Sequence, residues 1–187
     1  LHDEVSATLS SISYFAQAIQ RDDLQTDKNR FVNLIAKSAG DAKEKITDIV
    51  WAINPEHDEW KSFLAKCRRF ASDLLESKNI NYSLKITDDI PGKLDMDMRQ
   101  HLGLIFKEMI TNAVRHSGAT QLDVILTYQH NQLKLVVQDN GTGMDIDRVK
   151  KGNGLINIQK RVELISGTLR LKSEKDFGTR WMLKVPL

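Results

Sequence analysis

The sequence contains little cysteine and proline and no long apolar stretch. Its 187 residues include one cysteine, Cys67, and three prolines. One cysteine excludes a disulfide framework or a cysteine zinc site within the chain, and its place in an apolar-periodic stretch predicts a buried thiol. No run of about 18 apolar residues is present, and the opening Leu1-His2-Asp3-Glu4 lacks the basic and apolar regions of a signal peptide. We therefore expect a soluble protein of a reducing compartment.

A strong excess of charge of one sign is also absent. The 27 basic and 25 acidic residues leave a formal charge of +2, and they are interspersed along the chain. This pattern predicts no nucleic-acid partner. With 41% hydrophobic residues, the chain has an ordinary globular composition, and its length suits one domain with a smaller element or two small domains. It begins inside a helical pattern without methionine, which predicts a preceding upstream part.

Two helices are predicted at the N-terminal end. Apolar residues recur at steps of three and four in two runs, with Thr26 or Asp27 available to cap the second. Asn54-Pro55 ends the second run, because proline cannot continue a helix. The two stripes are too wide to cover each other alone, so we predict a homodimeric four-helix bundle, with packing on the downstream region as the alternative. The apolar positions are Leu1, Val5, Leu9, Ile12, Phe15, Ala16 and Ile19, then Phe31, Ile35, Ala42, Ile46, Ile49 and Ile53.

The remainder of the chain alternates helical and strand patterns. Apolar steps of three and four predict helices, and alternating apolar and polar residues predict strands joined mostly by hairpins. The expected order is typical of an α+β fold. The predicted elements are helices at 60–75, 97–116 and 155–165, and strands at 81–86, 121–128, 132–138, 168–173 and 179–185, with a turn at 129–131.

Polar residues and glycines mark a candidate ligand site. Glu108, Asn112 and Arg115 share a narrow arc of the long predicted helix, where a solvated polar face is the alternative. Residues 139–143 follow a strand, and residues 152–155 open a helix. Glycines there let backbone approach a ligand, and amides at a helix start favour phosphate, although a simple glycine-rich loop also fits. Neither a P-loop nor a dinucleotide fingerprint is present.

Taken in order, these segments resemble the ATP-binding superfamily shared by gyrase, heat-shock chaperone, histidine kinase and mismatch-repair ATPases. Lys107 to His116 (KEMITNAVRH) is similar to its N box, Asp139 to Gly143 (DNGTG) to its G1 box, and Gly152 to Leu155 (GNGL) to its G2 box. Gly178-Thr179 is similar to the closing Gly-Thr. The resemblance covers roughly residues 60–187. It implies a two-layer α/β sandwich with a mixed sheet.

The resemblance also implies roles for individual residues. Asp139 would accept a hydrogen bond from the adenine amino group, which selects against guanine, and Thr179 would support it through water. Asn112 would offer its side-chain oxygen to Mg²⁺, and Glu108 would act in the same water and metal network or activate the nucleophile. Phosphate contacts would come from Lys107, Arg115 and His116. The residues that would shape the pocket and bracket a short mobile lid are Gly141, Gly143, Gly152 and Gly154.

Leu1-His2-Asp3-Glu4-Val5 resembles the phosphoacceptor box of histidine kinases in which aspartate follows the histidine. One imidazole nitrogen of His2 would attack the γ-phosphate of ATP, while Asp3 would hold or take the proton on the other nitrogen. Related kinases often carry a glutamine four residues after this aspartate, where it serves the phosphatase reaction. The matching position here is Ala7, so this chain lacks the side-chain amide that serves the phosphatase reaction in those kinases.

Together these features predict the core of a sensor histidine kinase. Residues 1–55 would be a dimerisation and phosphotransfer hairpin, and residues 56–187 an ATP-binding catalytic domain. The cofactors would be ATP and Mg²⁺, and the partners a second copy and the receiver domain of a response regulator. The fragment would be cytoplasmic, with membrane attachment only through an upstream sensor region. The alternatives are a non-catalytic nucleotide-binding scaffold and another ATPase of the superfamily, such as an anti-sigma serine kinase.

Overall fold

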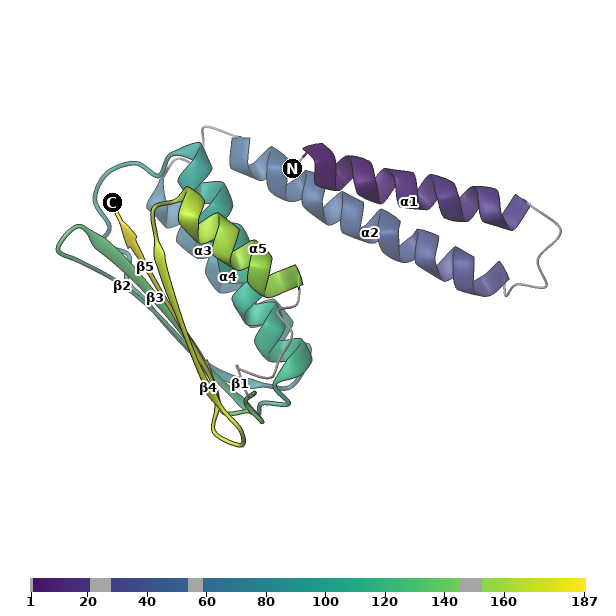
Figure 1. Ribbon diagram of the computed structural model, residues 1–187. Coiled ribbons are helices and arrows are strands. Elements are labelled where there is room, and N and C mark those ends of the chain that lie inside the picture. The colour runs from purple at the N-terminus through teal and green to yellow at the C-terminus, as the bar shows by residue number, and fades with distance from the viewer. Residues whose placement is uncertain (1, 21–27, 54–58, 145–152) are drawn as a thin grey trace. The chain divides into compact units, whose positions relative to one another are not determined.

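The computed structural model describes residues 2–20, 28–53, 59–144 and 153–187. The chain divides into two compact units, Leu1–Asn54 and Pro55–Leu187. The first is a helical hairpin, and the second combines three helices with a five-stranded sheet (Figure 1). None of the helices in the described ranges combines the length and the apolar character needed to cross a membrane. The predicted α+β fold is confirmed.

The first unit consists of α1 (His2–Gln20) and α2 (Lys28–Ile53), which lie antiparallel to each other (Figure 1). Steps of three and four bring apolar side chains to the contact, where the rings of Phe15 and Phe31 are 5.9 Å apart. Both helices agree with the predicted bounds within a few residues. The predicted cap at Thr26 or Asp27 lies outside the described residues.

Three helices cover one face of the sheet in the second unit (Figure 1). They are α3 (Trp60–Glu76), α4 (Met96–His116) and α5 (Asn153–Leu164). Asp95 caps α4, since its carboxylate accepts a hydrogen bond of 2.8 Å from the Met98 N–H. Cys67 is buried in α3, as predicted, and burial raises the pKa of its thiol to about 12.

The sheet has the order β1-β2-β3-β5-β4. β1 runs parallel to β2 because α4 connects them as a crossover, and the other pairs are antiparallel, so the predicted mixed sheet is confirmed. The turn after β2 consists of His130 and Asn131, which both have positive φ. This turn is one residue shorter than predicted. The bounds are β1 Asn81–Ile86, β2 Gln121–Gln129, β3 Gln132–Asp139, β4 Thr168–Glu174 and β5 Gly178–Pro186.

The core lies between the sheet and the three helices. Alternate residues of each strand face the helices, so Val137 in β3 and Trp181 in β5 are buried there and pair across the two strands. The same alternation carries Asp139, two residues after Val137, and Thr179, two residues before Trp181, onto the helix-covered face. Both are buried polar residues. The strand period therefore places a carboxylate and a hydroxyl beneath α4.

Candidate functional site

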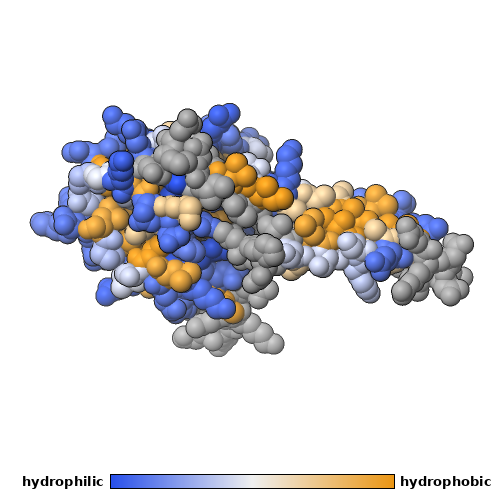
Figure 2. All heavy atoms as spheres, turned by 90° about the horizontal axis from the view of Figure 1, so that it is seen from above, coloured by the Kyte–Doolittle hydropathy of each residue, from blue (hydrophilic) through white to orange (hydrophobic). Residues whose placement is uncertain are grey.

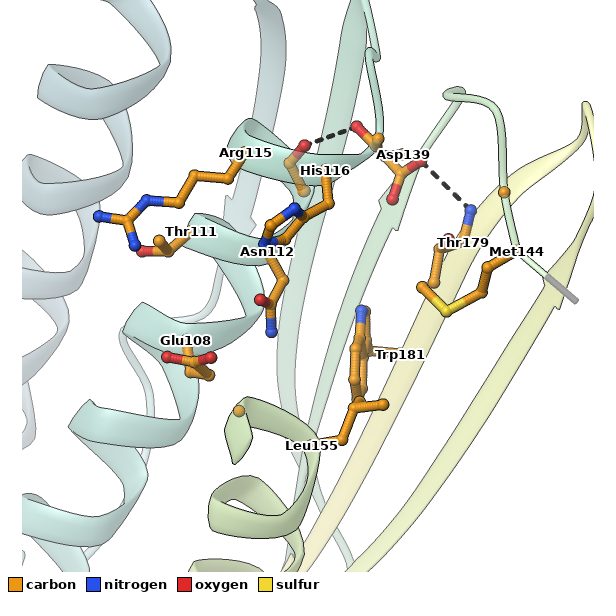
Figure 3. Close-up of a pocket in the computed structure, with 14 residues that line it drawn as sticks. Glu108, Thr111, Asn112, Arg115, His116, Asp139, Met144, Leu155, Thr179 and Trp181 are labelled. Carbon is orange, nitrogen blue, oxygen red and sulfur yellow. Dashed lines mark hydrogen bonds between the residues drawn. The ribbon is translucent and has the colours of Figure 1, made fainter. Parts of the chain in front are cut away.

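A pocket of about 510 Å³ opens where α4, β3, β5 and the start of α5 meet (Figure 3). It joins segments that are far apart in sequence, because β5 pairs with β3 and α5 packs beside α4. Polar side chains come mainly from α4, and apolar ones from the loop after β3, from α5 and from β5. The lining residues are Glu108, Thr111, Asn112, Ala113, Arg115, His116, Ser117, Asp139, Gly143, Met144, Gly154, Leu155, Thr179 and Trp181.

The α4 wall of the pocket carries Glu108, Asn112 and Arg115, which are spaced by four and three residues. Among the described residues, the side chains of Glu108 and Asn112 have no hydrogen-bond partner. A Cβ at position 154 would collide with Glu108 Oε1, and it would lie 3.8 Å from Asn112 Nδ2. Gly154 therefore leaves room for two oxygen-bearing side chains that are available to a ligand.

Asp139 lies at the far side of the pocket, and only 4% of its surface is exposed. Its Oδ1 accepts hydrogen bonds from the backbone N–H of Gly141 at 2.9 Å and of Thr179 at 3.2 Å. Burial raises the pKa of the carboxyl group, and these two hydrogen bonds act in the opposite direction. The other carboxylate oxygen points into the pocket (Figure 3). Two backbone donors thus hold one oxygen so that the second is presented as an acceptor.

Thr179 belongs to a small hydroxyl network at the start of β5. Its Oγ1 lies 2.9 Å from Ser173 Oγ, which also donates to the Gly178 carbonyl at 3.1 Å. Ser173 accepts from the backbone N–H of Met144 at 2.8 Å. The network ties β4 and β5 to the loop after β3, so it supports the side of the pocket where Asp139 lies.

Two glycines of this loop are required by backbone packing. A Cβ on Gly141 would collide with the carbonyl oxygen of Ser117, which also accepts a 2.8 Å hydrogen bond from the Thr142 N–H. Gly143 has a φ of +61°, and a Cβ there would collide with the Glu174 carbonyl oxygen. Gly143 and Gly154 line the pocket, whereas Gly141 lies behind it and seats the loop on the end of α4.

Several other residues singled out from the sequence lie elsewhere. Lys107 does not line the pocket, and its ammonium lies 5.1 Å from the centroid of the Phe70 ring on α3. Arg115 and His116 do line it, in the last turn of α4. His2 and Asp3 begin α1 in the other unit, and their side chains lie outside the described part, as does Gly152.

Asn140, inside the glycine-rich segment, has a structural role that the sequence did not suggest. Its Oδ1 accepts from the N–H groups of Thr120 and Gln121 at 3.0 and 2.9 Å, and its Nδ2 donates to Thr120 Oγ1 at 3.0 Å. These three hydrogen bonds join the end of β3 to the start of β2. Asn140 therefore anchors the end of β3 to the neighbouring strand.

The sequence interpretation gave no site role to Trp181, Thr111, Met144 or Leu155, which all line the pocket. Two of them carried a usable signal. Trp181 follows Thr179 by two residues in a strand, so both must face the same way. Thr111 lies three residues after Glu108 in a helix, so it belongs to the same wall.

Residues 97–187 match the family described as Histidine kinase-, DNA gyrase B-, and HSP90-like ATPase. Similarity extends over the whole chain to sensor protein VraS of Staphylococcus epidermidis, at 30% identity, and to sensor histidine kinase LiaS of Bacillus subtilis, at 28%. The chain is related to the sensor histidine kinases, and its residues 97–187 form an ATPase domain of the matched family. It spans about half the length of these curated relatives, 53% and 52% respectively.

Solved histidine kinase structures share the fold of this chain. The histidine kinase domain of the Erythrobacter litoralis EL346 blue-light activated histidine kinase matches with a TM-score of 0.63 at 15% identity, over 97% of this chain and 94% of that one. Acinetobacter baumannii histidine kinase AdeS matches with a TM-score of 0.62 at 18% identity, over 98% and 96%. Both the hairpin and the α/β unit of this chain therefore have counterparts of the same fold in known structures.

Proposed function

We propose that this chain binds Mg-ATP in the pocket, autophosphorylates His2 and passes the phosphoryl group to an aspartate in the receiver domain of a response regulator. The observation that carries the proposal is the convergence of Glu108, Asn112, Asp139 and Thr179 on one pocket, although they come from three separate elements. According to this proposal, residues 1–55 are the dimerisation and phosphotransfer domain, and residues 56–187 are the catalytic domain.

Asp139 accounts for the choice of adenine. Its free carboxylate oxygen accepts a hydrogen bond from an exocyclic amino group, which adenine has. Guanine has a carbonyl oxygen at that position, and two acceptors facing each other in a buried site would both lose their partners. Thr179, whose backbone N–H donates to Asp139, would hold a water beside the base through its hydroxyl group.

Asn112 and Glu108 would bind the Mg²⁺ that accompanies the phosphates of ATP. The described residues contain no group of three or more His, Cys, Asp or Glu side chains arranged as a metal site. Mg²⁺ bound with ATP requires less than that, because phosphates and waters supply most of its oxygen ligands. The unpartnered amide of Asn112 offers one oxygen, and Glu108 can hold a coordinated water. The bound ion would neutralise charge on the phosphates during transfer.

Arg115 and His116 suit the same end of the pocket electrostatically. The C-terminal end of α4 carries partial negative charge, which repels phosphate. Both residues occupy the last turn of α4, are exposed and line the pocket. Their positive or polar groups offset the charge of the helix end and reach toward the phosphates of the nucleotide.

The transfer itself is a nucleophilic substitution at phosphorus. A nitrogen of neutral His2 attacks the γ-phosphorus, the bond from that phosphorus to the bridging oxygen breaks, and ADP leaves with the electron pair. Asp3 orients the imidazole and accepts the proton of its other nitrogen. The carboxylate of the response regulator then attacks the phosphorus of the phosphohistidine, the phosphorus–nitrogen bond breaks, and Asp3 returns the proton so that His2 is neutral again. Because Ala7 has no amide, we propose no phosphatase activity through that position.

The hairpin supports dimerisation, which the proposed function requires for a stable phosphotransfer domain. Apolar atoms lie along its surface at the right of Figure 2. In a single chain, large apolar side chains of both helices are exposed, among them Leu9, Val32 and Val50. A second copy that packs against them would complete a four-helix bundle.

Labelling with γ-³²P ATP tests this function. The wild-type chain should acquire an acid-labile, base-stable label in the presence of Mg²⁺. His2→Gln should take up no label and should bind ATP as the wild type does, since His2 belongs to the other unit. Asn112→Ala should lose labelling while it retains most of its affinity for adenosine. Label that persists in His2→Gln at another residue would refute the assignment of His2.

A further inference from the structure

Trp181 presents an unused hydrogen-bond donor inside the pocket. The residue is 97% buried, with 3% of its surface exposed. Its indole N–H has no partner among the described residues. Among the described residues, His101 Nδ1 is the one side-chain polar atom that is both fully enclosed and without a hydrogen-bond partner. Trp181 Nε1 is therefore not fully enclosed, and a ligand in the pocket can reach it. Buried indole N–H groups usually find an acceptor, which suggests that a ligand supplies one here.

The direction of this donor is set by the sheet. Trp181 pairs with Val137 on one neighbouring strand and with Leu171 on the other, so its backbone is held from both sides. Figure 3 shows the indole nitrogen at the edge of the ring that faces Asp139 across the pocket. A rigid donor and a rigid acceptor therefore face one space, and neither has to reorganise when a ligand enters.

This pairing matches the chemistry of adenine. Adenine carries an amino donor flanked on each side by a ring nitrogen that accepts, N1 on one side and N7 on the other. We infer that Trp181 is a specificity-determining residue. Its indole N–H donates to the ring nitrogen beside the amino group bound by Asp139, and this inference rests on the proposed function. On the N1 side, guanine reverses both polarities, because it has a carbonyl oxygen next to a ring N–H.

Binding of ATP and three deaza analogues to the wild-type chain tests the inference without any mutation. Loss of the correct acceptor should weaken binding roughly 3- to 10-fold, the range for a neutral hydrogen bond. One of 1-deaza-ATP and 7-deaza-ATP should show this loss in calorimetry. 3-Deaza-ATP should bind as ATP does, because N3 does not flank the amino group. Equal affinities for all four nucleotides would overturn the inference.

Trp181→Phe provides the second arm, since it removes the N–H and keeps an aromatic ring. This variant should bind ATP more weakly by the same factor and should no longer distinguish the analogue that the wild type rejects. Trp60→Phe is the matched control, because Trp60 is equally buried but lies in α3, outside the pocket. It should keep the wild-type pattern.

The outcomes separate the inference from the function beneath it. If Trp181→Phe keeps the wild-type preference among the analogues, Trp181 is not the donor and the inference fails, while ATP binding stands. If the wild-type chain binds none of the four nucleotides, the proposed function itself fails. A poorly folded Trp181→Phe would leave the wild-type series to decide.

Discussion

The helical hairpin and the α/β unit differ in how far their apolar side chains are buried. In the hairpin, Leu9, Val32 and Val50 are 50%, 52% and 57% exposed, and Ala42 is the one buried apolar residue among those whose burial is described. In the α/β unit, Leu64, Val124 and most other apolar residues of the core are almost fully buried. Because burial of apolar surface is the main stabilising contribution, the α/β unit can complete its core alone. The hairpin needs another surface.

The largest effect is expected from a charge on the exposed stripe of the hairpin. Ile46 is 45% exposed in the single chain, so Ile46→Asp would cost a lone hairpin little. In a four-helix bundle, the same unpaired charge would be buried and would cost several kcal/mol per chain. Sedimentation at micromolar concentration should therefore show a dimer for the wild type and a monomer for the variant.

Lys37→Asp is the control for this experiment. Lys37 is exposed and lies about two and a half helical turns earlier, on the opposite side of α2. That variant should remain dimeric. A wild-type chain that sediments as a monomer with its helices intact would contradict the bundle and remove the need for a second copy.

A large effect of a different kind is expected at Gly178, the first residue of β5, directly after the turn from β4. Its φ is +82°, and a Cβ there would collide with the carbonyl oxygen of Asp139. Gly178→Ala should lower the free energy of unfolding of the α/β unit by about 2–4 kcal/mol, through backbone strain and steric overlap. Urea denaturation should report this loss, with the dimer unchanged. An unaltered unfolding midpoint would show that the turn has another conformation.

Two adjacent residues should separate ligand binding from stability within the α/β unit. Asp139→Ala should weaken ATP binding by about 1.5–3 kcal/mol, the typical worth of a hydrogen bond to a charged group. Asn140→Ala should lower the free energy of unfolding by about 1–3 kcal/mol, because it leaves backbone donors of β2 without partners, and should bind ATP normally once folded. Calorimetry and denaturation on both variants measure the two effects. Equal ATP affinities in Asp139→Ala and wild type would refute the adenine contact.

Acid should mimic the loss of Asp139. Protonation turns the acceptor carboxylate into a group that carries its own proton, so ATP affinity should fall as the pH falls through the pKa of this group. Burial raises that pKa, so the fall should begin at a higher pH than for an ordinary aspartate. Asp139→Asn has no proton to gain at this position and should lack this step.

The smallest effect, of opposite sign, is expected at Gly40 in α2. A Cβ there would meet nothing within 4 Å. Gly40→Ala should stabilise the hairpin by about 0.5–1 kcal/mol, because alanine restricts the unfolded chain and favours helix. Thermal melting should show a modest rise in the hairpin transition. A fall would mean that a partner surface approaches the backbone at this residue.

Element bounds and the main site residues were accessible from the sequence because they depend on local periods. Steps of three and four predicted the helices within a few residues, and the same period placed Glu108 and Asn112 on one wall. The resemblance of residues 139–143 to a G1 box led to the prediction that Asp139 faces a nucleotide. Asp139 does line the pocket, while its contact with adenine stays a prediction.

The residues that were missed or displaced depend on pairings that no local pattern contains. Lys107 belongs to the N box by sequence, but its place on α4 turns it toward Phe70 on α3. Asn140 lies between two pocket residues by sequence, yet it bonds to the start of β2. Each outcome depends on which helix or strand lies alongside, and that neighbour is far away in the chain.

The sequence by itself determined the alternation of helices and strands and the exposed stripe of the hairpin, because these follow from residue type and spacing. The candidate ATP-binding residues came from the resemblance of short segments to known ATPase motifs. The tertiary structure decided the insertion of β5 between β3 and β4, which brings Thr179 and Trp181 beside Asp139. That placement requires a strand to pair with one far from it in sequence. Long-range pairing is selected by the packing of the whole core, so only the folded chain reveals it.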